Sequence, residues 1–207
     1  MTRALSITNI NTKKSKTYLL KEVWLAVFGM LSIGGFWIIY GDEKHGKTTI
    51  ALMLAEMFST LCRTVYISGE EGLELEFREA MKRANIGSKS KLKFYEYISI
   101  AELCEKLRVK RSWQVVFIDN TTVYNDELKN GVVKELKQEF PKVLFVFLSH
   151  MEKGEPYLSS SKLIKRYAKA ILRVEGLACF VSGRVPGGKV VINEEKAILY
   201  HGNEIKE

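Results

Sequence analysis

Short apolar runs alternate along most of this chain with segments whose apolar residues recur every three or four positions. The runs are rich in β-branched and aromatic residues, which predicts buried strands. These strands are expected at residues 36–40, 64–68, 93–98, 115–118 and 143–148. The helical spacing predicts helices at residues 49–60, 73–84, 99–109 and 126–139. Such alternation predicts an α/β fold, a mostly parallel sheet with helices on both faces.

The last part of the chain changes to shorter apolar runs without helices between them. Four such runs occupy residues 170–174, 178–182, 189–193 and 197–201. Segments containing glycine, proline or asparagine separate them, at residues 175–176, 186–188 and 193–195. Short strands separated by turn residues are typical of hairpins. The sequence therefore predicts a C-terminal antiparallel extension at one edge of the sheet.

The length of 207 residues suits one α/β domain and is too short for two ordinary ones. We expect residues 1–33 to form an N-terminal arm and a lead-in helix, and residues 34–207 to form a single domain. The most apolar early stretch, residues 23–39, is interrupted by serine and glycine. It is too broken to span a bilayer, so no membrane association is expected.

The cysteines Cys62, Cys104 and Cys179 show neither zinc nor redox-motif spacing, which favours reduced thiols in the core. The N-terminus lacks the apolar stretch of a secretion signal. These two features together favour a cytoplasmic protein. The formal net charge of +8 favours an anionic partner, with nucleic acid as the leading candidate.

The strongest motif is the phosphate-binding loop at residues 41–48, which matches G-x-x-x-x-G-K-[ST]. Its glycines let successive backbone N–H groups point at a polyphosphate, its lysine reaches the β- and γ-phosphates, and its threonine hydroxyl ligates Mg²⁺. It follows a predicted strand and opens a predicted helix, whose N-terminal dipole favours phosphate. The acidic side chains within the loop must point away from a triphosphate, and they favour slow turnover. The predicted nucleotide contacts in the loop are Gly41, Asp42, Glu43, Lys44, His45, Gly46, Lys47, Thr48 and Thr49.

A carboxylate suited to the magnesium side of the site ends the apolar run at residues 115–118. This residue is Asp119, at the position of a Walker B aspartate. Together with Thr48 it is the predicted magnesium ligand. The alternative is that Asp119 caps the next turn, since the following Asn120 is a similar turn former.

Hydrolysis also needs a group that orients or deprotonates water. Many ATPases place a glutamate directly after the Walker B aspartate, but Asn120 occupies that position here. The segment Ser-Gly-Glu-Glu at residues 68–71 closes a strand at the same sheet edge as the phosphate loop. Glu70 is our predicted base and Glu71 the runner-up. An acidic pair that only favours the dipole of the next helix is the alternative.

These motifs together resemble the RecA-like ATPases, in particular the RadA/Sms, KaiC and DnaB-type branch. The resemblance covers about residues 34–201. It implies an α/β RecA-like ATPase domain that binds ATP and Mg²⁺, with Lys47 and Glu70 catalytic. It also implies that Ser149 or His150, at the tip of the strand at 143–148, senses the γ-phosphate.

Two further assignments come from the same resemblance. Residues 155–166 would form the loop that faces nucleic acid, followed by a strand at residues 168–176. The family's Lys-x-Arg pair is replaced here by Ser182-Gly183-Arg184, so Arg184 is the candidate finger that reaches a neighbouring subunit's site. A surface arginine beside a hairpin is the alternative for Arg184. The residues predicted to contact nucleic acid, single-stranded DNA above all, are Lys153, Lys162, Lys165 and Arg166.

The sequence thus favours an oligomeric ATPase, a ring or filament, that couples ATP hydrolysis to DNA binding in replication, recombination or repair. A mobile element or phage is one setting that suits such a minimal core. Two alternatives share the same loop: an ATP-binding regulatory module with little hydrolysis, and a small-molecule or nucleotide kinase. A GTPase is disfavoured because the chain has no Asn-Lys-x-Asp guanine motif.

Overall fold

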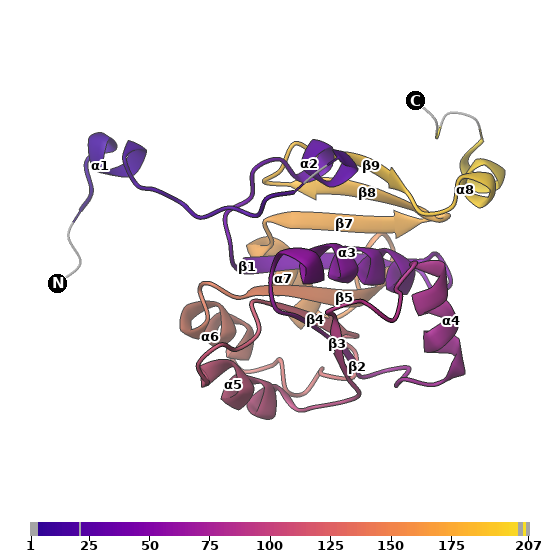
Figure 1. The fold of residues 1–207 in the computed structure, drawn as a ribbon, viewed down its shortest axis with the longest axis horizontal. Helices are drawn as coiled ribbons and strands as arrows, with labels where there is room; N and C mark the ends of the chain where they lie inside the picture. The colour runs from indigo at the N-terminus through magenta and orange to yellow at the C-terminus, as the bar shows by residue number, and fades with distance from the viewer. Residues whose placement is uncertain (1–3, 21, 203–204, 206–207) are drawn as a thin grey trace.

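A computed structural model describes residues 4–20, 22–202 and 205, and one nine-stranded mixed sheet forms its centre (Figure 1). The strands are β1 (Gly35–Gly41), β2 (Thr64–Ser68), β3 (Lys93–Tyr95), β4 (Val115–Asp119), β5 (Leu144–Glu152), β6 (Glu155–Pro156), β7 (Ala170–Glu175), β8 (Ala178–Gly183) and β9 (Gly188–Val191). Their order is β3-β2-β4-β5-β1-β7-β8-β9, and β6 pairs with β5 alone. Strands β3, β2, β4, β5, β1 and β7 run parallel, whereas β8 and β9 are antiparallel additions.

The parallel register brings the carboxyl ends of four strands to one edge of the sheet. Gly41 of β1 pairs with His150 of β5, and Ser68 of β2 pairs with Asp119 of β4. The phosphate loop follows Gly41 directly, and the acidic pair follows Ser68. Open α/β sheets bind their ligands at this edge, so the topology alone gathers the predicted site residues there.

Helices cover both faces of the sheet. They are α1 (Ile7–Asn11), α2 (Glu22–Phe28), α3 (Lys47–Leu61), α4 (Leu75–Arg83), α5 (Ile100–Arg108), α6 (Val132–Glu139), α7 (Ser159–Tyr167) and α8 (Glu194–His201). One core cluster joins α2, α3 and α4 to one face, and a second joins α5, α6 and α7 to the other. This arrangement confirms the predicted α/β fold with helices on both faces and antiparallel strands near its C-terminus.

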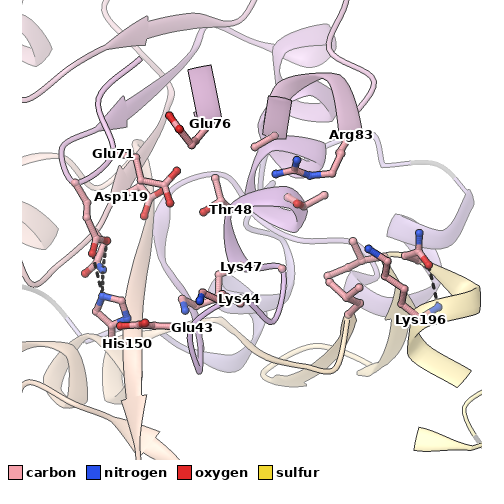
Figure 2. Close-up of a pocket in the computed structure, with 18 residues that line it drawn as sticks. Glu43, Lys44, Lys47, Thr48, Glu71, Glu76, Arg83, Asp119, His150 and Lys196 are labelled. Carbon is pink, nitrogen blue, oxygen red and sulfur yellow. Dashed lines mark hydrogen bonds and ion pairs between the residues drawn. The ribbon is translucent and has the colours of Figure 1, made fainter. Parts of the chain in front are cut away.

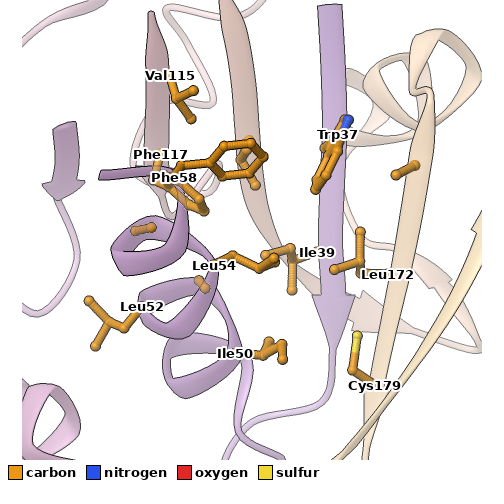
Figure 3. Packing of buried hydrophobic residues seen from close by; sticks show 14 of the residues in the cluster. Trp37, Ile39, Ile50, Leu52, Leu54, Phe58, Val115, Phe117, Leu172 and Cys179 are labelled. Carbon is orange, nitrogen blue, oxygen red and sulfur yellow. The ribbon is translucent and has the colours of Figure 1, made fainter. Parts of the chain in front are cut away.

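Helix α3 packs across the sheet centre through aromatic side chains (Figure 3). The ring of Phe58 lies 5.5 Å from that of Trp37 and 5.0 Å from that of Tyr18, in edge-to-face geometry. Phe58 is fully buried, so its replacement leaves a cavity that the sheet cannot fill. This contact fixes the helix that begins at the phosphate loop.

We expect Phe58→Ala to lower the free energy of unfolding by about 3–5 kcal/mol, because transfer and cavity terms add for a buried phenylalanine. Urea denaturation followed by far-UV circular dichroism measures this change. Leu61→Ala, at the partly exposed end of the same helix, is the matched control and should cost less than about 1 kcal/mol. Equal losses in the two variants would contradict the central role of Phe58.

The predicted strand at residues 197–201 is wrong, because this segment belongs to helix α8. The Asn193 side chain accepts a hydrogen bond from the Lys196 backbone N–H, which caps the helix. Glu194 and Glu195 in the first turn favour the N-terminal end of the helix dipole. The residues interpreted as a turn are therefore a helix start, and Ala197 packs inward.

Two other expectations for the C-terminal part also need correction. Strand β7 pairs with β1 in parallel, so it continues the parallel sheet, and the antiparallel extension begins only at β8. The predicted loop at residues 155–166 consists of β6 and most of α7. Helix α7 forms because Ile164 enters the core while Leu163 and Tyr167 pack beside it at helical spacing.

Two elements are shorter than the sequence predicts. The strand expected at residues 93–98 ends at Tyr95, and the helix expected at residues 126–139 starts at Val132. The segment between β4 and α6 forms turns that bury Tyr124 and Leu128. The apolar residues of this segment recur at helical spacing although it forms turns, which is why the sequence predicts too early a start for the helix. At the other end of the chain, residues 4–15 are exposed and project from the body (Figure 1), whereas Lys16 and Thr17 pair with residues 32 and 33. The division at residues 33 and 34 stays a prediction.

Candidate nucleotide-binding site

A cleft of about 740 Å³ opens at the carboxyl edge of the parallel strands (Figure 2). The phosphate loop and the start of α3 form its floor, and the residues that follow β2 and β4 form one side. The end of β5, helix α4, the turn after β7 and the segment from the end of β9 into α8 complete the lining. The cleft therefore collects most of the residues that the sequence predicts for nucleotide binding.

The backbone of the phosphate loop has the shape of an anion cradle. Lys44 and Gly46 have φ of 63° and 98°, and such left-handed residues among right-handed ones turn successive N–H groups to one side. A Cβ at Gly41 would lie 2.1 Å from the Val174 carbonyl oxygen, so only glycine fits there. No side chain caps the first turn of α3, which leaves its N–H donors to a ligand. These donors fit a polyphosphate.

Lys47 supplies the positive charge of the cradle. Its Nζ donates a hydrogen bond of 2.7 Å to the Asp42 carbonyl oxygen, so the side chain lies over its own loop. Burial lowers the pKa of Lys47, while the carboxylates of Asp119 and Glu70 oppose this shift. A buried ammonium group with lowered pKa gains from an anionic ligand, since the ligand replaces lost hydration.

Asp119 and Thr48 face the same cleft and fit a magnesium ion. The Asp119 carboxylate is buried, and its Oδ2 accepts a 2.5 Å hydrogen bond from the Tyr66 hydroxyl. Burial raises the pKa of Asp119 to about 7, and the Glu71 and Glu70 carboxylates add to this rise. A buried carboxylate that is costly to ionise favours a cation beside it, and hard oxygen donors suit Mg²⁺.

Glu70 lies beside two side chains from neighbouring strand ends. Its Oε2 accepts a hydrogen bond of 2.5 Å from Asn120 Nδ2, and its Oε1 lies 3.2 Å from His150 Nε2. Within the described residues Glu71 makes no such contact, but burial and the Glu70 carboxylate raise its pKa. The predicted base is thus oriented by Asn120, as an effective base requires.

Not all predicted contacts reach the cleft. The His45 side chain turns toward the other side of the loop, where its Nδ1 accepts a 3.2 Å hydrogen bond from the Gly176 N–H. Ser149 is buried within β5, and its hydroxyl donates to the His150 carbonyl. The Asp42 side chain is outside the lining as well, although Glu43, Lys44 and Thr49 are within it. His150 is therefore the only one of the two sensor candidates that faces the cleft.

Arg184 lies at the opposite edge of the sheet from the phosphate loop. It follows β8, whose last residue Gly183 pairs with the first residue of β7. There it borders a second cleft of about 530 Å³ with Lys162, Lys165 and Arg166. Arg184 cannot reach the nucleotide cleft of its own chain, so a catalytic role requires a neighbouring copy.

Most of the charged residues that line the second cleft are basic, and one of them, Lys165, is paired with a carboxylate. Lys165 forms an ion pair of 2.8 Å with Glu155 and lies over the Tyr40 ring, so its charge is largely used within the protein. Among the described residues no ion pair is formed by Lys162, Arg166 or Arg184. Lys153 lies apart, in the exposed turn between β5 and β6.

Sequence reasoning missed residues on two sides of the nucleotide cleft. Glu76 and Arg83 of α4 enter it from one side (Figure 2). Leu177, Ile192 and Lys196 border it on another. The helix-capping pattern that begins at residue 193 could have revealed α8, which carries Lys196. The approach of α4 depends on tertiary packing and has no local signal.

Comparison with known proteins supports the fold assignment. No protein-family model matches the chain, and no curated protein does. The flagellar accessory protein FlaH from Methanocaldococcus jannaschii superposes with a TM-score of 0.59 at 17% identity, over 84% of this chain and 91% of that one. A KaiC-like protein from Pyrococcus horikoshii OT3 superposes with a TM-score of 0.59 at 15% identity, over 85% of this chain and 93% of that one. The ATPase domain of a third protein gives a TM-score of 0.52 at 15% identity, over 75% and 80% of the two chains.

These likenesses confirm the predicted α/β fold, a mostly parallel sheet with helices on both faces. Identities this low establish the fold alone, so activity has to be argued from the site. In the described part of the chain, no helix has the length and apolar character needed to cross a bilayer.

Proposed function

We propose that this protein is a magnesium-dependent ATPase. The observation that carries the proposal is the meeting of three groups in one cleft: the phosphate loop, the buried Asp119 and the oriented Glu70. Each serves a different need of phosphoryl transfer, namely anion binding, a metal ligand and a base. A loop that served only as a turn would not need the other two.

Each residue has a role in catalysis that follows from its chemistry. Lys47 and the N–H groups of the loop hold the β- and γ-phosphates, and Thr48 and Asp119 hold the magnesium ion. That ion neutralises charge on the phosphate oxygens when it is bound. Glu70 orients the attacking water and accepts its proton, while His150 is placed to contact the γ-phosphate end.

The nucleoside end is proposed to lie on the side of β9 and α8. Leu177 and Ile192 border Gly46 there so closely that a Cβ on this glycine would meet them at 2.8 and 3.1 Å. Two apolar side chains beside the phosphate loop suit the face of a base, and Lys196 suits the polar groups of the nucleoside. The sequence has no Asn-Lys-x-Asp guanine motif, so ATP is the proposed nucleotide.

Turnover with different acceptors tests the proposal against its alternatives. We expect release of inorganic phosphate from Mg-ATP, and stimulation of that release by single-stranded DNA. Transfer of phosphate to a small acceptor would instead indicate a kinase. Binding of ATP without phosphate release would indicate a regulatory module, which the acidic Glu43 in the lining favours. Mass measurement with and without nucleotide tests the proposed ring or filament, in which Arg184 would serve a neighbour's cleft.

The basic second cleft is the proposed contact for single-stranded DNA, and its role in replication, recombination or repair rests on that contact. We expect the double variant Lys162→Ala/Arg166→Ala to bind a labelled oligonucleotide about ten-fold more weakly, with a shallower dependence on salt. Fluorescence anisotropy across a salt series measures both. Lys89→Ala/Lys91→Ala removes the same charge from a loop outside this cleft and should change binding less. Equal losses would indicate a diffuse charge effect.

A further inference from the structure

Asn120 occupies the position after the Walker B aspartate, where many ATPases carry their base. Its side chain is buried and borders the nucleotide cleft. The Oδ1 atom accepts a 2.8 Å hydrogen bond from the Thr122 backbone N–H. Because that contact fixes which end of the amide is oxygen, Nδ2 must face Glu70 and His150. The amide therefore has one orientation only.

Both hydrogens of Nδ2 then have a partner. One goes to Glu70 Oε2 at 2.5 Å and the other to His150 Nε2 at 2.6 Å. A nitrogen that accepts a hydrogen bond carries no proton, so a neutral His150 ring holds its proton on Nδ1. Asn120 thus determines which ring nitrogen of neutral His150 carries the proton, as well as the position of the Glu70 carboxylate.

The backbone beneath Asn120 is held firmly on two sides. The Thr121 N–H donates a 2.8 Å hydrogen bond to the Leu148 carbonyl of β5. The Thr121 hydroxyl lies 2.9 Å from that of Ser161 on α7, and both side chains are fully buried. A residue anchored on strand and helix can hold a carboxylate with little freedom, as positioning of a base requires.

We propose that Asn120 is the positioning residue for the base Glu70. A neutral amide can fix Oε2 of the carboxylate by a hydrogen bond, without placing a positive charge beside it. The remaining lone pairs of the carboxylate stay available to a water molecule. This inference rests on the proposed ATPase function. It divides two roles between two residues: Glu70, which follows β2, is the base, and Asn120, which follows β4, positions it.

Steady-state kinetics of Asn120→Ala test the proposal. We expect kcat to fall by about 10–100-fold while the Kd for Mg-ATP stays within about two-fold, because loss of an orienting partner affects the reactive geometry. In a Glu70→Gln background the same change should cause no further loss, since the two residues act as a unit. Independent, additive losses would overturn the proposal, and so would an unchanged kcat in the single variant.

Two further variants complete the test. Asn120→Asp keeps the oxygen that accepts from Thr122 but replaces the donors with a second oxygen and adds a buried charge beside Glu70, so it should lose turnover, and a wild-type kcat in this variant would overturn the proposal. Asn125→Ala changes the same residue type in the same loop outside the cleft and should retain the wild-type kcat. Equal kcat losses in Asn125→Ala and Asn120→Ala would overturn the assignment of Asn120.

A spectroscopic measurement tests the contact without any turnover. Long-range ¹H–¹⁵N correlations recorded on the neutral imidazole should show an unprotonated Nε2 on His150 in the wild type. In Asn120→Ala this nitrogen can carry the proton and donate to Glu70, so its signal should move to the protonated range. An unchanged tautomer would overturn the inferred contact. A wild type that binds ATP without hydrolysing it would overturn the proposed function instead, and the two failures are thus distinguishable.

Discussion

Glu70→Gln should lower the rate of ATP hydrolysis by about 10²–10⁴-fold and leave nucleotide affinity almost unchanged. The amide cannot take a proton from water, but it has nearly the size of the carboxylate and can still accept from Asn120 Nδ2. Nucleotide binding depends on the phosphate loop and on Asp119, which this change leaves intact. Phosphate release gives the rate, and titration with a fluorescent ATP analogue gives the affinity.

Glu71→Gln is the matched comparison, because Glu71 is the next residue and borders the same cleft. Its carboxylate has a raised pKa but, among the described residues, lacks a hydrogen bond like the one with which Asn120 orients Glu70. We expect a loss of less than about ten-fold for this variant, as orientation contributes more than basicity alone. The reverse ranking of the two variants would assign the base to Glu71.

The sheet centre and the phosphate loop could be predicted from the sequence because their signals are local. The loop needs glycine where its backbone approaches Val174 or turns left-handed, and its lysine and threonine stand at fixed positions beside them. Strands buried on both faces are apolar throughout, so β1 and β4 stand out from their surroundings. Asp119 follows from the same logic, since it ends such a strand at the edge where ligands bind.

Other parts of the site depend on information that no local pattern holds. His45 belongs to the loop motif, yet tertiary contact with the turn after β7 directs its ring away from the cleft. Ser149 and His150 are neighbours in β5, and strand alternation sends only one of them to the cleft. Arg83 reaches it because α4 packs beside α3, a long-range contact. The position of Asn120 was visible in the sequence, but its hydrogen bonds were not.

Asp119→Asn should abolish magnesium-dependent hydrolysis and at the same time stabilise the protein without nucleotide. Loss of a metal ligand is expected to lower the rate by about 100-fold or more, since metal stabilisation of the transition state amounts to several kcal/mol. The gain in stability has a different cause. Burial raises the pKa of Asp119 from 3.8 to about 7, so ionising this carboxyl in the folded protein is costly. A neutral asparagine avoids that cost and can still accept from the Tyr66 hydroxyl.

The pH dependence of this gain identifies its origin. Between pH 3.8 and about 7 the unfolded chain has released the proton that the folded protein keeps, so wild-type stability falls as the pH rises through this window. Above about pH 7 the penalty is complete and reaches roughly 2–4 kcal/mol. In thermal melts without nucleotide, the Tm of Asp119→Asn should therefore be higher than that of the wild type at pH 8 and nearly equal to it at about pH 4.

With Mg-ATP added, the wild type should have the higher Tm, because only the wild type gains stability from the bound complex. Asp126→Asn is the control, since Asp126 is exposed and pairs with Lys129 at the surface. We expect that variant to show neither the gain at pH 8 nor the loss of hydrolysis. A drop in stability for Asp119→Asn at pH 8 would mean that the carboxylate is stabilised in the fold by its neighbours, and the magnesium-side role of Asp119 would lose its physical basis.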